Sequence, residues 1–108
     1  MALISKVVDF RDKRNWKKFN DPKDLAISLL LEASELLELF QWKNSGEVIE
    51  HRMQDIKDEL ADILYYTFLM SHDLGINLEE AVLAKLQKNE EKYPIDKAYN
   101  SNKKYNEL

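Results

Sequence analysis

The chain has 108 residues, a net charge of −4 at pH 7 and no cysteine. A chain of this length suits one domain, and the lack of cysteine excludes disulfides, thiolate metal sites and thiol nucleophiles. The sequence contains no recognisable signal peptide, no apolar run long enough to cross a bilayer and no basic stripe large enough for a nucleic-acid duplex. We therefore expect a cytoplasmic protein that binds neither membranes nor nucleic acids.

The apolar pattern predicts four helices in chain order. The first covers residues 3–19 and loosens before Asn20. The second begins at Asp21 and Pro22, because an aspartate can accept from the free amides of a first turn and proline suits the first helical position. It runs to about residue 43, and Gly46 is expected to supply the left-handed conformation that ends many helices.

The third predicted helix covers residues 47–74 and ends at Gly75. The fourth covers residues 78–93, with Asn77 and Glu80 as its capping pair. Residues 95–108 are polar and are predicted to form an irregular tail. Short connections favour antiparallel neighbours, so we expect an all-α, four-helix-bundle-like domain over residues 1–94 that is oligomeric.

Two pairs of acidic residues lie within the apolar stretches: Glu32 with Glu35, and Glu59 with Asp62. Residues three apart lie on nearly the same face of a helix, so the two members of each pair repel each other. No lysine or arginine stands three or four positions from any of the four. Two such pairs on facing helices would bind divalent cations, and all-oxygen ligands favour Mg²⁺, with Mn²⁺ as the other choice.

A plainer interpretation stays open for Glu32 and Glu35, because both continue a polar stripe of the kind that any solvated helix face carries. Asp62 is different, since its helix face continues through Tyr66 and Leu69. The sequence therefore predicts a buried carboxylate at Asp62, which costs several kcal/mol unless it is paired, hydrogen-bonded or bound to metal.

The chain resembles the MazG-like all-α nucleoside triphosphate pyrophosphohydrolases in three ordered segments, LLLEASELLELFQW, DELADILYY and AVLAKLQKNEEKYP. A further segment, RNWKKFNDPKDL, is similar to the dCTP pyrophosphatase branch. The resemblance implies Mg²⁺-dependent hydrolysis of an NTP or dNTP, with dCTP-like or modified nucleotides favoured, to the monophosphate and pyrophosphate. It also implies a homodimer or homotetramer. Asn20 stands where that branch tends to have histidine, which leaves the base preference open.

Carried over by position, the resemblance implies that the metal ligands are Glu32, Glu35, Glu59 and Asp62. Glu32 or Glu35 would then act as the catalytic base. The phosphate end would be lined by Lys85, Asn89, Lys92 and Tyr93. The nucleobase would be bordered by Trp16 and Trp42, with Tyr66 facing the same cavity. The alternative is a non-catalytic, oligomeric helical adaptor with an acidic surface.

Overall fold

The computed structural model describes residues 2–108, and every regular element in this part of the chain is helical. The all-α prediction is confirmed. The helices form two compact units, of which the first ends at Gly75 and the second runs from Ile76 to Leu108. Across residues 2–108, no helix combines the length and the apolar character that crossing a membrane requires.

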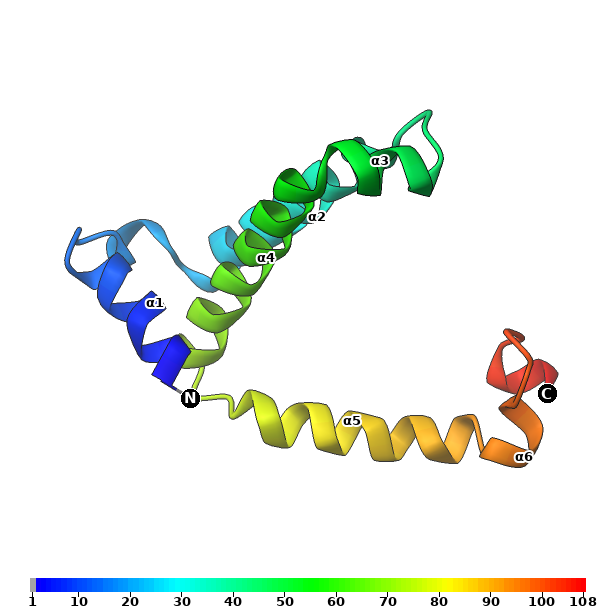
Figure 1. The fold of residues 1–108 in the computed structure, drawn as a ribbon. Coiled ribbons are helices and arrows are strands. Elements are labelled where there is room, and N and C mark those ends of the chain that lie inside the picture. Colours follow the sequence, from blue (N-terminus) through cyan, green and yellow to red (C-terminus); the bar gives the residue numbers. More distant parts are fainter. Residues whose placement is uncertain (1) are drawn as a thin grey trace. The chain divides into compact units, whose positions relative to one another are not determined.

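Two long helices form the body of the first unit. They are α2 (Pro22–Phe40) and α4 (Met53–Asp73), which pack along each other (Figure 1). A third helix, α1 (Ala2–Asp12), packs against α4. The 3-10 helix η1 (Lys17–Phe19) lies between α1 and α2. The predicted first helix is thus shorter than expected, because the chain turns through Asn15, whose φ is 54°.

The start of α2 is set by its own sequence, as predicted. The Asp21 carboxylate accepts a hydrogen bond of 2.9 Å from the backbone N–H of Asp24, and Pro22 occupies the first turn. The helix ends at Phe40, and the residue that takes the left-handed conformation after it is Trp42, with φ 63°. The prediction that Gly46 would end this helix is wrong.

Gly46 lies instead inside a separate short helix, α3 (Ser45–His51). Asn44 caps α3 by accepting from the backbone N–H of Glu47 at 2.9 Å, and the Glu47 side chain accepts from the Asn44 backbone N–H. The predicted third helix is therefore two helices. They are separated at Arg52, whose φ of −127° and ψ of 25° interrupt the helical backbone.

The core of the first unit is small and is formed by all three of its longer helices. Val8 of α1, Leu25 of α2 and Leu69 of α4 are buried against one another. Arg11 is also fully buried, and its guanidinium donates to both carboxylate oxygens of Asp73 at 2.6 and 2.9 Å. This two-bond ion pair joins the C-terminal ends of α1 and α4.

The second unit contains α5 (Leu78–Lys92), α6 (Ile95–Ala98) and the 3-10 helix η2 (Tyr105–Glu107). The predicted cap is confirmed, because the Asn77 side chain accepts from the backbone N–H of Glu80 at 3.0 Å. Gly75, with φ 68°, follows α4 as predicted.

The C-terminal segment is more regular than expected, since α6 and η2 lie in it. The rings of Tyr93 and Tyr105 meet edge to face with centroids 6.1 Å apart, which ties η2 back to the end of α5. The division into a domain of residues 1–94 and a tail of residues 95–108 remains a prediction.

Candidate metal and nucleotide site

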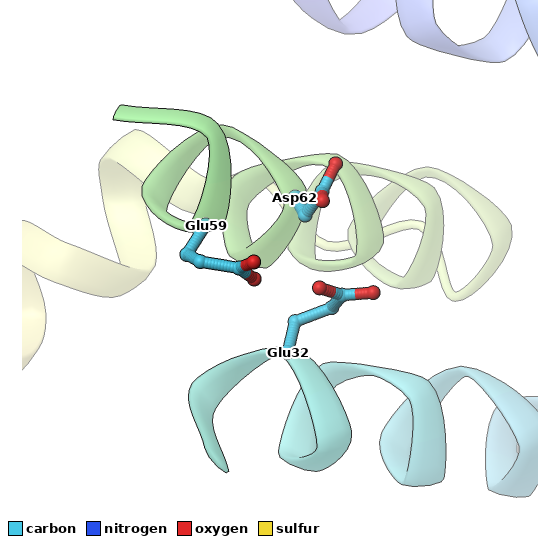
Figure 2. A group of neighbouring side chains, drawn as sticks. All are labelled: Glu32, Glu59 and Asp62. Atoms are coloured by element: carbon cyan, nitrogen blue, oxygen red, sulfur yellow. The ribbon is translucent and has the colours of Figure 1, made fainter. Parts of the chain in front are cut away.

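Three carboxylates from two helices converge in the first unit. Glu32 extends from α2 toward Glu59 on α4, and Asp62 stands one turn further along α4 (Figure 2). One oxygen of each of these three groups lies within 4.8 Å of the others. The two helices therefore bring together three of the four acidic residues that the sequence singled out.

The electrostatics of this carboxylate cluster (Glu32, Glu59 and Asp62) are those of crowded like charges. Burial raises the pKa of Glu32 to about 7, and the neighbouring carboxyl groups act in the same direction. Burial also raises the pKa of Glu59, and the charges of Glu35 and Asp62 add to that effect. The crowding therefore favours the protonated forms of Glu32 and Glu59 unless a positive charge neutralises the cluster.

The cluster has the features of a site for a hard divalent cation. One oxygen of Glu32 and one of Glu59 are buried and have no hydrogen-bond partner among the described residues. A buried carboxylate oxygen without a partner is costly, and a cation placed among these groups would satisfy it. The ligand atoms are all oxygens, which suits Mg²⁺ or Mn²⁺. The residues present therefore fit such an ion.

Two of the predicted ligands are placed differently from the expectation. Asp62 is exposed, so the prediction of a buried carboxylate at this position is wrong; its apolar companions on α4 pack inward while Asp62 itself lies where a pocket opens. Glu35 is also exposed and lies outside the group of three, although its charge helps to raise the pKa of Glu32 and Glu59. Glu35 thus lies beside the cluster rather than in it.

A pocket of about 570 Å³ joins this cluster to a group of aromatic rings. Its volume falls in the range of about 300–1,000 Å³ that small-molecule sites occupy. The pocket is lined by the carboxylates of Glu32 and Asp62 and by the aromatic side chains of Phe10, Trp16, Tyr65 and Tyr66. A pocket with this lining suits a molecule that carries both a planar ring and a group that binds a metal ion.

The aromatic side chains support one another through edge-to-face contacts. The ring of Phe10 lies 6.0 Å from that of Trp16 and 6.1 Å from that of Tyr65, and the rings of Tyr65 and Tyr66 are 5.0 Å apart. Burial raises the pKa of Tyr66, and the negative charges of Glu32 and Asp62 add to this, so Tyr66 lies close to the carboxylates. Trp16 and Tyr66 therefore share one pocket.

The other predicted site residues lie elsewhere in the chain. Trp42 does not line this pocket; it is 94% exposed in the turn after α2. The residues proposed for the phosphate end belong to the second unit: Lys85, Asn89 and Lys92 are on α5, and Tyr93 follows its last residue. Spacings of four and three residues place Lys85, Asn89 and Lys92 on one face of α5.

Sequence reasoning missed several residues that line the pocket, namely Lys6, Val7, Phe10 and Tyr65. Asn20, which also lines it, was noted only as a departure from the relatives. Two features of the sequence could have indicated these pocket-lining residues. Phe10 stands a few residues before Trp16, and Lys6 precedes Phe10 by one helical turn.

Fold and site together define an all-α protein with a carboxylate cluster that adjoins a pocket lined by aromatic side chains. The profile of the MazG-like family matches residues 27–108. The chain belongs to the MazG-like family, and the resemblance noted in its sequence is confirmed. It is 35% identical over 105 residues to dCTP pyrophosphatase 1 of Homo sapiens, and 32% identical over 105 residues to dCTP pyrophosphatase 1 of Rattus norvegicus.

These alignments cover 93% of this chain and 62% of each of those two proteins, so the chain spans less than two thirds of their length. Among solved structures, a pyrophosphatase from Archaeoglobus fulgidus is 43% identical, with a TM-score of 0.82. That match covers 86% of this chain and 90% of the archaeal protein. The predicted MazG fold is thus confirmed.

Proposed function

We propose that the protein is a Mg²⁺-dependent nucleotide pyrophosphohydrolase that converts an NTP or dNTP, dCTP-like or modified, to the monophosphate and pyrophosphate. The observation that carries this proposal is the convergence of Glu32, Glu59 and Asp62, of which Glu32 and Asp62 also line a pocket with aromatic side chains. The similarity to proteins named dCTP pyrophosphatase 1 and to a pyrophosphatase of known structure supports it.

In this proposal Glu32, Glu59 and Asp62 hold the cation, and Glu35 completes the ligand set from the same face of α2. Bound Mg²⁺ would offset the negative charge of the triphosphate. In the absence of the ion, the acidic site would repel the substrate. A triphosphate carries several negative charges, so these carboxylates alone would exclude it.

Side chains of the protein would transfer the proton and bind the base. Glu32 or Glu35 would take the proton of the attacking water as general base. Trp16 and Tyr66 would hold the base, because aromatic faces stack on planar rings. Trp42 does not line the pocket of its own chain, so its proposed contact to the base would be made from a second copy of the chain.

We also propose that the charged face of α5 receives the phosphate end of the substrate. The residues concerned are Lys85, Asn89, Lys92 and Tyr93. Lysine ammonium groups would balance the charge of the departing pyrophosphate. The proposed assembly is a homodimer or homotetramer. It is supported by exposed apolar side chains on both long helices of the first unit, among them Leu30 and Leu37 of α2 and Leu60 and Leu64 of α4.

The test is a screen of canonical and modified nucleotides with purified protein and Mg²⁺, in which the products are separated and identified. The expected products are the nucleoside monophosphate and pyrophosphate. Release of orthophosphate alone would indicate a different hydrolase, and no turnover of any nucleotide would favour the non-catalytic adaptor.

Glu59→Gln and Asp62→Asn should abolish turnover and should also remove the rise in melting temperature that Mg²⁺ gives the parent protein. Asp58→Asn is the matched control on the same helix, because the Asp58 carboxylate lies outside the cluster and accepts from the Gln54 amide at 2.9 Å. The Asp58→Asn variant should keep both the turnover of the nucleotide and the rise in melting temperature on addition of Mg²⁺.

A further inference from the structure

A cationic side chain stacks on the aromatic side chains of the pocket without lining the pocket itself. The guanidinium of Arg14 lies over the ring of Phe10, with its central carbon 3.7 Å from the ring centroid. The same carbon lies 5.8 Å from the centroid of the Trp16 ring. Phe10 and Trp16 line the pocket, whereas Arg14 does not. Any influence of Arg14 on the shape of the pocket therefore passes through these two rings.

Hydrogen bonds hold Arg14 at both ends of the residue. Its guanidinium donates to the backbone carbonyl of Phe10 at 2.9 Å, and its backbone N–H donates to the carbonyl of Arg11 at 3.1 Å. The Arg11 carbonyl also accepts from the N–H of Trp16 at 3.2 Å, across the left-handed residue Asn15. Arg11 is fully buried, so the turn that carries Arg14 and Trp16 starts from a fixed residue.

Phe10 connects Arg14 to the other rings of the pocket. Its ring meets the rings of Trp16 and Tyr65 edge to face, at the distances given above. Phe10 and Trp16 are only about half covered, with 44% and 45% exposure, and side chains this exposed keep alternative rotamers unless a contact selects one. A guanidinium over the Phe10 ring selects one orientation of that ring, and the edge-to-face contact transmits the constraint to Trp16.

Arginine suits this role better than a general surface cation. Its guanidinium is planar and can lie flat on a ring while its fork of N–H groups donates to a nearby carbonyl. Within residues 2–108 Arg14 makes no salt bridge. The ring and the backbone carbonyl of Phe10 are thus the groups that orient its side chain.

We propose that Arg14 is a positioning residue for base binding, which holds the Phe10 and Trp16 rings in the orientation that receives the base of the nucleotide. This inference rests on the proposed function, in which Trp16 stacks on the base. Rings that are already ordered in the free protein lose less conformational freedom when a planar ligand binds. Loss of Arg14 would therefore weaken nucleotide binding and leave the chemistry at the carboxylates unchanged.

The first measurement is steady-state kinetics on the nucleotide that the parent protein turns over best. Arg14→Met removes the guanidinium and should raise KM by about two- to fivefold, as expected for one cation–π contact at an exposed site, with little change in kcat. Arg14→Lys keeps a cation and should restore much of the loss. Lys18→Met is the matched control, because the Lys18 ammonium lies 5.2 Å from the Phe19 ring and neither residue lines the pocket; KM should not change.

A double-mutant cycle separates ring positioning from simple attraction of a charged substrate. When Arg14 acts through Phe10, adding Arg14→Met to Phe10→Leu should raise KM no further. Fluorescence anisotropy decay gives a readout besides activity. In a Trp42→Phe background Trp16 is the only tryptophan left, and Arg14→Met should add fast local motion to the decay of its emission.

Three outcomes would each overturn the inference while the proposed function stands. They are a lower kcat with unchanged KM in Arg14→Met, equal effects of Arg14→Met with and without the Phe10 ring, and an unchanged anisotropy decay. Arg14 is exposed, so the fold should survive its replacement, and urea midpoints check this; Arg14→Gln repeats the test should Arg14→Met not fold. No turnover of any nucleotide by the parent protein would instead reject the proposed function, and the anisotropy decay alone would then decide whether Arg14 holds the Trp16 ring.

Discussion

The ion pair between Arg11 and Asp73 gives the sharpest prediction about stability. Asp73→Ala leaves the Arg11 guanidinium without its main partner, although Arg11 is fully buried. Removing one partner of a buried pair costs about 3–5 kcal/mol. The Asp73 side chain keeps 12% exposure, so we expect the lower end, about 3 kcal/mol, which lowers Tm of a chain of this size by roughly 12–24 °C.

The assay is urea unfolding of the parent and of three variants. Asp12→Ala is the control, because the Asp12 side chain accepts from the same guanidinium at 3.1 Å but is 49% exposed, and it should cost less than about 1 kcal/mol. The double variant Arg11→Met with Asp73→Leu removes both charges and should regain most of the lost stability. Equal costs for Asp73→Ala and Asp12→Ala would refute this reasoning.

The same ion pair predicts a pH dependence. The Arg11 guanidinium lowers the pKa of Asp73 below its usual range, against the opposing effect of burial. A carboxyl group whose pKa is lowered by folding stabilises the folded state above its unfolded pKa, and this contribution is lost as the pH falls toward its folded pKa. The stability difference between the parent and Asp73→Ala should therefore shrink on acidification.

Three further predictions concern the site and its supports. The pKa of Glu32 is raised from 4.5 to about 7, so the metal-free protein should lose stability as the pH rises through that interval. Mg²⁺ should remove this loss. Midpoints of urea unfolding, measured across this pH range with EDTA and with Mg²⁺, test the prediction. Trp16→Ala should raise KM for the nucleotide more than it lowers kcat, whereas Trp16→Phe should change both little; steady-state kinetics decide. Asn44→Ala should lower the unfolding free energy by about 1 kcal/mol in urea titrations, because the cap of α3 is lost.

The features that the sequence predicted correctly are set by neighbouring residues. The caps of α2 and α5 depend on Asp21 and Asn77, each of which accepts from an amide three residues later. Such contacts need no tertiary structure. It was also predictable that two carboxylates share one face of α2 and two share one face of α4, because helical spacing fixes which residues of a helix lie on the same face.

The features that were missed depend on contacts between distant residues. Arg52 is a good helix former, and nothing beside it in the sequence marks the end of α3. Lys6 and Phe10 of α1 line the pocket because α1 is held against α4. Part of that attachment is the hydrogen bond from Arg11 to Asp73, which lies 62 positions further along the chain. Periodicity identified the apolar companions of Asp62, but it could not show that the pocket opens beside it.

The turn after α2 has a consequence for spectroscopy. The chain has two tryptophans, and the indole of Trp42 is 94% exposed on a backbone with φ 63°. In a Trp16→Phe variant, Trp42 is the sole indole emitter, and its fluorescence should have the red-shifted maximum of a ring in water. A blue shift of the emission maximum at higher protein concentration would show that a second chain covers the Trp42 ring. A blue shift on addition of nucleotide would show that the nucleotide covers it.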